Sequence, residues 1–129
     1  MADLDLVRRL GAQEHGLVVV STTRPDGTVQ TSVVNAGVVD GAIAFVARRA
    51  TRKLDNIERT GRAAVTFRSG WEWAAVEGPA RIAGGDPQLL RDVFTAAGGT
   101  HDDWDEYDRV MAAEGRVAVF VTPARVSTN

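Results

Sequence analysis

Hydrophobic residues along the chain follow two spacings, and most of the sequence has the alternation or the unbroken apolar runs of β-strands. The first run, residues 16–23 (GLVVVSTT), is almost continuously apolar, which predicts a strand covered on both faces. Pro25 and Gly27 mark a turn into a second extended segment, residues 28–37. A third segment, residues 38–47, contains Asp40-Gly41, which is typical of a tight hairpin turn. The first half of the chain therefore predicts three antiparallel strands.

A spacing of about 3.6 residues marks helices in four other places. These are residues 2–13, residues 50–60, the segment from Asp86-Pro87 to Gly98-Gly99, and the segment in which Trp104, Tyr107 and Met111 share one face. Two strands on either side of Ser69-Gly70 and a last strand over residues 116–126 complete the order. Because hairpin-linked strands dominate, a parallel doubly wound sheet is not expected. The predicted fold is mainly β, a small antiparallel barrel with peripheral helices, formed by one domain over residues 1–129.

Composition excludes several classes of function. The 129 residues carry 15 basic and 17 acidic side chains, which argues against a nucleic-acid or anionic membrane surface. The sequence has no cysteine, and the acidic run HDDWDEYD matches no calcium or zinc spacing, so no metal is expected. No apolar run approaches the ~20 residues of a membrane helix, and the first residues lack the pattern of a signal peptide. We therefore expect a cytoplasmic protein.

Positive charge concentrates where a strand gives way to a helix, in the stretch ARRATRKLDN. Four cations fall within six residues of it: Arg48, Arg49, Arg52 and Lys53. A helix start already carries partial positive charge, so each exposed cation there costs roughly 0.3–1 kcal/mol. A bound phosphate would offset this cost through amide hydrogen bonds and charge-assisted contacts. The stretch predicts a local anion site, with Thr51 as the helix cap.

The same stretch allows a second interpretation, a solvated basic patch partly paired with Asp55 and Glu58. In the anion-site interpretation, Lys53 and Asn56 lie three residues apart and both face a groove between helix and sheet. The histidines, His15 and His101, lie in no recognisable hydrolase setting. No side chain is therefore expected to be catalytic.

Two long runs, QTSVVNAGVVDGAIAFVARRATRKLDNI and AAVTFRSGWEWAAVEGPARI, resemble the pyridoxamine-phosphate-oxidase-like split-barrel flavoproteins. Within that family they are most similar to the short actinobacterial branch of flavin/deazaflavin oxidoreductases that use coenzyme F420. The most specific piece is the Thr51-Arg52-Lys53 triplet between a strand and a short helix, followed by RAAVTF. The resemblance covers nearly the whole chain and implies a six-stranded antiparallel split β-barrel of the FMN-binding type, with peripheral helices.

The resemblance also implies a cofactor site at the interface of a homodimer. In the family the triplet holds the cofactor phosphate, a strand backbone lies along the flavin or deazaflavin ring, and a residue two before AVEG reaches the ring from the second subunit. Arg48 and Arg49 add positive charge suited to the phosphodiester and glutamate tail of F420, and Arg8 and Arg9 are an equal alternative for this role. The implied cofactor-binding residues are Ser32, Val33, Val34, Asn35, Val46, Ala47, Arg48, Thr51, Arg52, Lys53 and, in the second subunit, Trp73.

The implied activity is hydride transfer from F420 to a small unsaturated or quinone-like substrate. The alternatives are an FMN-dependent oxidoreductase of the same family and a non-catalytic FMN- or haem-binding protein on the same barrel. Trp73 stands where FMN-binding members often have an amide side chain, which favours F420. True pyridoxamine phosphate oxidases have a C-terminal extension with Arg and His, and this sequence ends in PARVSTN. Oxidation of pyridoxamine phosphate is therefore not expected.

Overall fold

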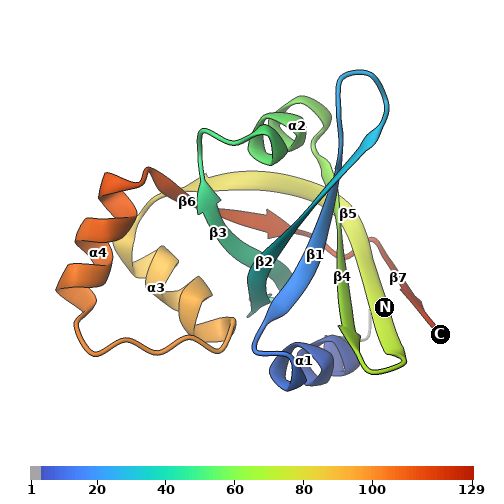
Figure 1. Ribbon diagram of the computed structural model, residues 1–129, viewed down its shortest axis with the longest axis horizontal. Helices are drawn as coiled ribbons and strands as arrows, with labels where there is room; N and C mark the ends of the chain where they lie inside the picture. The colour runs from blue at the N-terminus through green and yellow to red at the C-terminus, as the bar shows by residue number, and fades with distance from the viewer. Residues whose placement is uncertain (1–3) are drawn as a thin grey trace.

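The strands of the chain close into a six-stranded antiparallel barrel with helices around it, as the sequence predicts (Figure 1). A computed structural model describes residues 4–129, so Ala2 and Asp3 of the first predicted helix lie outside the described residues. The elements in chain order are α1 (Leu4–Gln13), β1 (Leu17–Thr23), β2 (Val29–Val39), β3 (Ala42–Arg48), α2 (Arg52–Thr60), β4 (Arg62–Ser69), β5 (Glu72–Gly84), α3 (Pro87–Ala96), α4 (Trp104–Ala113), β6 (Arg116–Val121) and β7 (Arg125–Thr128).

Two long strands, β2 and β5, each belong to two sheets and so join the halves of the barrel. Residues 29–35 of β2 pair with β1, and residues 36–39 pair with β3. In the same way, residues 72–79 of β5 pair with β4, and its last residues pair with β6. The strand order is β4-β1-β2-β3-β6-β5, and the β4–β5 pairing closes the ring. Each partner change bends the sheet, which gives the split barrel its two half-sheets.

The last predicted strand is wrong as a single element, because the chain leaves the barrel at Pro123. Thr122 N donates to Pro79 O (2.8 Å) and Ala124 N donates to Glu77 O (2.9 Å), so this segment crosses over β5. Proline has no N–H for a strand ladder. A Cβ at Gly78 would lie 1.9 Å from Thr122 O, so the crossing requires glycine there. The chain then continues as β7, a seventh strand that pairs with β5 outside the ring.

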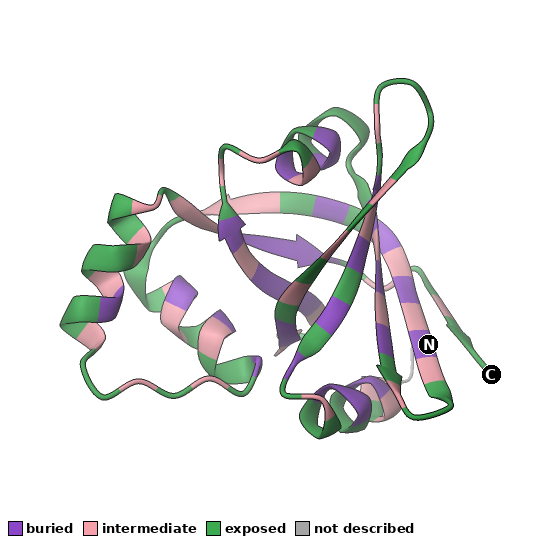
Figure 2. Cartoon of the chain, in the orientation of Figure 1, coloured by how far each residue is buried: buried purple, intermediate pink, exposed green. Residues whose placement is uncertain are grey.

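Strands β3 and β6 are covered on both faces, whereas β1 is not. Phe45 and Val119 face the barrel interior, and Ala44 and Phe120 pack against the layer formed by α3 and α4 (Figure 2). The predicted double coverage of β1 is wrong in the single chain. Its buried and exposed residues alternate, and its outward side chains include Leu17 (50% exposed) and Val19 (38% exposed).

The local signals at the Asp40-Gly41 turn and at the start of α3 are confirmed. Asp40 and Gly41 both adopt positive φ (50° and 75°), as the hairpin turn requires. Asp86 accepts a hydrogen bond from Leu89 N (3.0 Å) ahead of Pro87, the first residue of α3. Helices α1 and α2 lie at opposite ends of the barrel in Figure 1, and α3 and α4 lie beside β3 and β6. None of the helices within residues 4–129 has the length and apolar character to cross a membrane.

Helix α3 approaches β2 so closely that only glycine fits at the contact. A Cβ added at Gly37 would lie 2.3 Å from the backbone carbon and oxygen of Ala96. By contrast, a Cβ at Gly11 in α1 would lie 3.5 Å from the Phe67 ring, an ordinary packing distance. Both glycines are buried, so they form a matched pair that differs in the space around them.

We expect Gly37→Ala to lower the free energy of unfolding by about 1–3 kcal/mol, because α3 has to move away from β2. Gly11→Ala is expected to be neutral or stabilising by up to about 1 kcal/mol, because alanine favours the helix. Urea unfolding of both variants tests this pair. Equal stability of the two variants would contradict the close approach of α3 to β2.

Candidate functional site

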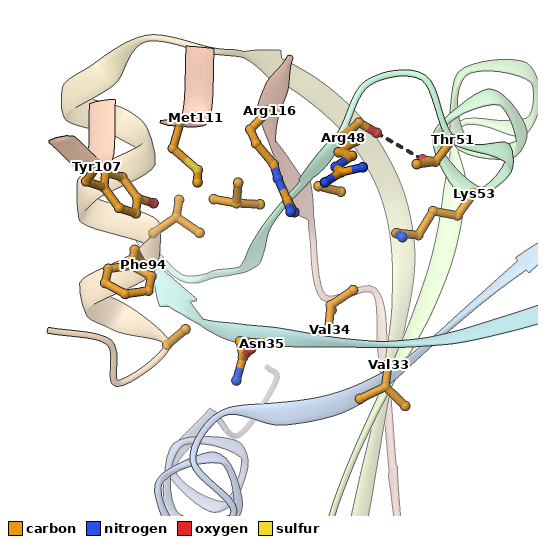
Figure 3. Close-up of a pocket in the computed structure, with 14 residues that line it drawn as sticks. Val33, Val34, Asn35, Arg48, Thr51, Lys53, Phe94, Tyr107, Met111 and Arg116 are labelled. Carbon is orange, nitrogen blue, oxygen red and sulfur yellow. Dashed lines mark hydrogen bonds between the residues drawn. The ribbon is translucent and has the colours of Figure 1, made fainter. Parts of the chain in front are cut away.

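A cavity of about 410 Å³ lies at the side of the barrel, between β2 and the layer of α3 and α4 (Figure 3). Its floor is the end of β2 that pairs with β1, and its walls are the end of β3, the start of α2, the first residue of β6 and the two helices. Its volume is within the range of small-molecule sites. The lining residues are Val33, Val34, Asn35, Val46, Ala47, Arg48, Thr51, Lys53, Val93, Phe94, Ala97, Tyr107, Met111 and Arg116.

One end of the cavity is cationic. Arg48 and Arg116 are directly opposite each other in the β3–β6 ladder, and Lys53 approaches from α2. Glu114 bridges the two arginines: Arg48 Nη2 donates to Glu114 Oε2 (3.3 Å), and Arg116 Nε donates to Glu114 Oε1 (2.9 Å). Among the residues that line the cavity none is acidic. Three cations therefore face one space with a single carboxylate at its edge.

Lys53 is the only lysine of the sequence, and its pKa is lowered in the fold. Burial, and then the positive charge of Arg116, lower the pKa of Lys53. The hydrogen bond and charge of Arg116 lower the pKa of Glu114, so that carboxylate stays ionised. Lys53 is thus a partly buried cation that faces other cations, and a negatively charged ligand would stabilise its charged form.

Helix α2 begins without a side-chain cap. Thr51 occupies the cap position, but its Oγ1 donates to Arg48 O (3.0 Å) and accepts no helix N–H, so the predicted capping role of its side chain is wrong. Arg52 and Lys53 are the first residues of the helix, where acidic residues would be favourable. The amides at this end have no side-chain acceptor, beside the cationic end of the cavity.

The other end of the cavity is apolar and aromatic. Phe94 and Tyr107 pack with ring centroids 4.9 Å apart, and Met111 lies one helical turn beyond Tyr107. Tyr107 Oη donates to Leu90 O (3.3 Å). Burial raises the pKa of Tyr107, so this hydroxyl keeps its proton at neutral pH. This end presents flat apolar surface and can exclude water from a planar ligand.

The structure brings together eight of the eleven predicted cofactor-binding residues: Val33, Val34, Asn35, Val46, Ala47, Arg48, Thr51 and Lys53. Ser32, Arg52 and Trp73 do not line the cavity. Ser32 Oγ is buried and has no hydrogen-bond partner within residues 4–129, and Arg52 is exposed. Trp73 lies on the outer face of β5, the face that alternates with buried Ala74. Its expected role in the second subunit stays a prediction, as does the cofactor-binding role of the other ten residues.

Two other residues of the basic stretch do not belong to the cavity. Arg49 forms ion pairs with Asp55 and Glu58, so for this arginine the solvated-patch interpretation is correct. Asn56 is buried and donates to Thr22 Oγ1 (3.1 Å) and Gln30 Oε1 (3.2 Å). The prediction that Asn56 faces the groove with Lys53 is therefore wrong, because its amide ties α2 to the barrel instead.

Six lining residues were missed by the sequence analysis: Val93, Phe94, Ala97, Tyr107, Met111 and Arg116. The five on and just after the helices belong to predicted apolar faces, but the spacing alone does not distinguish a face that packs from one that also lines a cavity. Arg116 gave no local signal, because only the pairing of β3 with β6 brings it to Arg48. No group of three or more histidine and acidic side chains suited to a metal occurs within the described part of the chain.

Replacing Lys53 by methionine is expected to leave the ligand-free protein equally stable or up to about 1 kcal/mol more stable, because a partly buried charge is removed. Lys53→Arg keeps the charge and is the control. Since the pKa of Lys53 is lowered in the fold, the unfolded chain binds more protons at pH values between the folded and unfolded pKa. The stability difference between wild type and Lys53→Met should therefore shrink as the pH rises through that interval. Urea unfolding at low salt and at several pH values measures this difference in the free energy of unfolding. A free energy of unfolding lower by about 2 kcal/mol or more in Lys53→Met would contradict the argument.

Solved structures with the same fold carry different descriptions. An F420 reductase is 19% identical, with 86% of this chain and 88% of that chain covered and a TM-score of 0.68. A pyridoxamine 5'-phosphate oxidase-related, FMN binding protein from Nostoc punctiforme is 12% identical, with 99% and 84% covered and a TM-score of 0.70. The haem storage protein HutZ from Vibrio cholerae is 11% identical, with 98% and 94% covered and a TM-score of 0.67. At these identities the likeness shows the fold alone.

Sequence comparison assigns the family. No curated protein matches the chain. The family model described as pyridoxamine 5'-phosphate oxidase matches residues 7–129, which is nearly the whole chain and includes both the barrel and the cavity. The chain belongs to the pyridoxamine 5'-phosphate oxidase-like family.

Proposed function

We propose that the protein is an oxidoreductase that uses coenzyme F420 to transfer a hydride to a small unsaturated or quinone-like substrate. The observation that carries this proposal is that one cavity has a cationic end and an apolar end. Arg48, Lys53 and Arg116 face its cationic end, and Phe94 and Tyr107 form its apolar end. A phosphate-bearing cofactor with a planar ring has the same two-part character.

The residues present fit such a cofactor. Lining residues include three cations and no carboxylate, which suits a phosphate group. Val33, Val34 and Asn35 are consecutive residues of β2 that line the cavity, and Figure 3 shows the Val34 side chain on its cavity side. Asn35 Nδ2 donates to His15 O (2.9 Å), which fixes the side chain at the end of this floor.

When bound, the cofactor supplies the hydride, and the chain's own residues bind, orient and exclude water. Lys53 and Arg48 hold the negatively charged end, and Thr51 lies beside it. Phe94 and Met111 cover the opposite end with apolar surface, where water would compete with an electron-poor acceptor. No lining side chain has to act as a nucleophile.

FMN is the second candidate, because its phosphate suits the same cationic end. The excess of positive charge favours F420, whose phosphodiester is followed by further carboxylates. Trp73 also favours F420, since its side chain accepts no hydrogen bond from a flavin ring.

Titration of the purified protein with F420, FMN and haem tests the assignment. We expect F420 to bind with a dissociation constant in the micromolar range or tighter, at least ~10-fold below that of FMN, measured by fluorescence and calorimetry. Oxidation of reduced F420 should then follow addition of a quinone or enone. Stoichiometric binding of FMN or haem, with F420 not bound, would contradict the proposal.

We further propose that the protein acts as a homodimer in which the outer face of β1, β2 and β5 is the interface. Leu17, Val19 and Val33 are exposed by 50%, 38% and 65%, and Val19 and Val33 are cross-strand neighbours. Val33 also lines the cavity, so the exposed face continues into the site. Trp73 belongs to the same outer face, since Val19 pairs with Thr66 and Thr66 pairs with Ala75, two residues along from Trp73. A second copy is the partner that covers this face and also brings a tryptophan to the cavity edge.

Val19→Asp is expected to shift the protein from dimer to monomer and to weaken F420 binding at least ~10-fold, because a buried charge opposes association and each site loses the partner's Trp73. Val110→Asp is the control, since Val110 is equally exposed (41%) but lies on α4 away from this face. Light scattering gives the mass of each variant. A monomeric wild type that binds F420 would contradict the proposed interface.

A further inference from the structure

The strongest unexplained feature of the chain is the pairing of two like charges across β3 and β6. Arg48 and Arg116 are direct cross-strand neighbours at the ends of these strands. Like charges in this position are destabilising. Glu114 offsets part of the repulsion by accepting from both arginines, and Lys53 adds a third cation from α2. The cluster of Arg48, Lys53, Arg116 and Glu114 thus keeps two positive charges in excess.

Arg116 has donors left for a ligand. Its hydrogen bond to Glu114 uses Nε, and over residues 4–129 no hydrogen bond engages its two Nη atoms. Its side chain is partly buried (29% exposed), and Figure 3 shows it directed from β6 into the cavity, between Met111 and Arg48. The bond to Glu114 fixes the guanidinium plane, so the remaining donors are held in one direction.

We propose that Arg116 is a specificity-determining residue that binds the anionic group of the ligand from the strand side of the cavity, opposite Lys53. It selects a ligand with two negative charges near the phosphate over the same ring without a phosphate. This inference rests on the proposed function only in that a phosphate-bearing cofactor occupies the cavity. The shared chemistry is a dianionic phosphate region, either a monoester, as in FMN, or a diester followed by a carboxylate, as in F420.

The geometry favours Arg116 over Arg49 and Arg52, two arginines of the basic stretch ARRATRKLDN. Arg49 is already paired with Asp55 and Glu58 outside the cavity, and Arg52 is exposed and lines no part of it. The anion site therefore combines Lys53 and Arg48 with a residue from the far end of the chain. The excess of two positive charges in this site matches the charge of a dianion. A helix start with one lysine would supply only one full positive charge.

The test compares ligand pairs that share a ring. Riboflavin and FMN form one pair, and F420 and its phosphate-free deazariboflavin form the other. In Arg116→Ala, we expect affinity for the phosphorylated member of the pair that binds wild type to fall at least ~10-fold, with affinity for the other member changed less than ~2-fold. Arg116→Lys should recover part of the loss, and the salt dependence of binding should decrease in Arg116→Ala.

The control is Arg109→Ala, which removes an exposed arginine of α4 that does not line the cavity and should leave all affinities unchanged. Equal losses for both members of a pair, or no loss for the phosphorylated member, would overturn the role of Arg116. If FMN binds and F420 does not, the proposed function fails, but the FMN and riboflavin pair still decides the role of Arg116.

A second readout does not need any cofactor. Lys53 gives a single side-chain lysine signal in protein labelled with ¹³C-lysine, because the sequence has no other lysine. Arg116→Ala is expected to raise the pKa of Lys53 in the ligand-free protein, since a neighbouring positive charge is removed. Titration with inorganic phosphate should raise the pKa of Lys53 in wild type and raise it less in Arg116→Ala. A Lys53 signal that responds to neither change would overturn the proposal that both cations share one anion.

Discussion

The change of partner along β2 is the constraint on which the site depends. Up to Asn35 this strand pairs with β1, and from Ala36 onward it pairs with β3. The first part supplies the cavity floor and the exposed apolar face, and the second part contains Gly37, against which α3 packs. Because one strand positions the floor, the wall helix and the outer face, these three features are fixed relative to one another. The cavity therefore lies beside the barrel, whose interior is filled by its own side chains.

Charge in the cavity follows from the same topology. The end of β3 brings Arg48 to the start of β6, and the short connection into α2 brings Lys53 to the same place. Glu114 lies just before β6 and compensates one of the three charges. The remaining repulsion is an energetic cost in the ligand-free protein and becomes a contribution to affinity when an anion binds. The same positive charges therefore lower the stability of the ligand-free protein and raise its affinity for an anion.

Local chemistry accounts for what the sequence predicts well, and long-range pairing accounts for what it does not. Asp40-Gly41 and Asp86-Pro87 act within a few residues, so the hairpin and the start of α3 are predicted correctly. Arg116 enters the site only through the pairing of β3 with β6, a register that neither strand's own sequence specifies. The apolar run of β1 predicts a strand covered on both faces, but its outer face is exposed in the single chain, because the composition of a run does not specify what packs against it.

The same fold carries proteins described as an F420 reductase, an FMN binding protein and a haem storage protein, so the barrel does not select the cofactor. Under the proposed function, selection of the cofactor has to come from the side chains that line the cavity. In this chain α3 and α4, which lie between β5 and β6 in sequence, and the first residue of β6 supply Phe94, Tyr107, Met111 and Arg116. The continuous stretch from α3 to the start of β6 therefore provides both the apolar wall and the additional cation. Because the wall and the cation lie on one continuous stretch, a shift of α4 against β6 would change the space for the substrate and the position of Arg116 together.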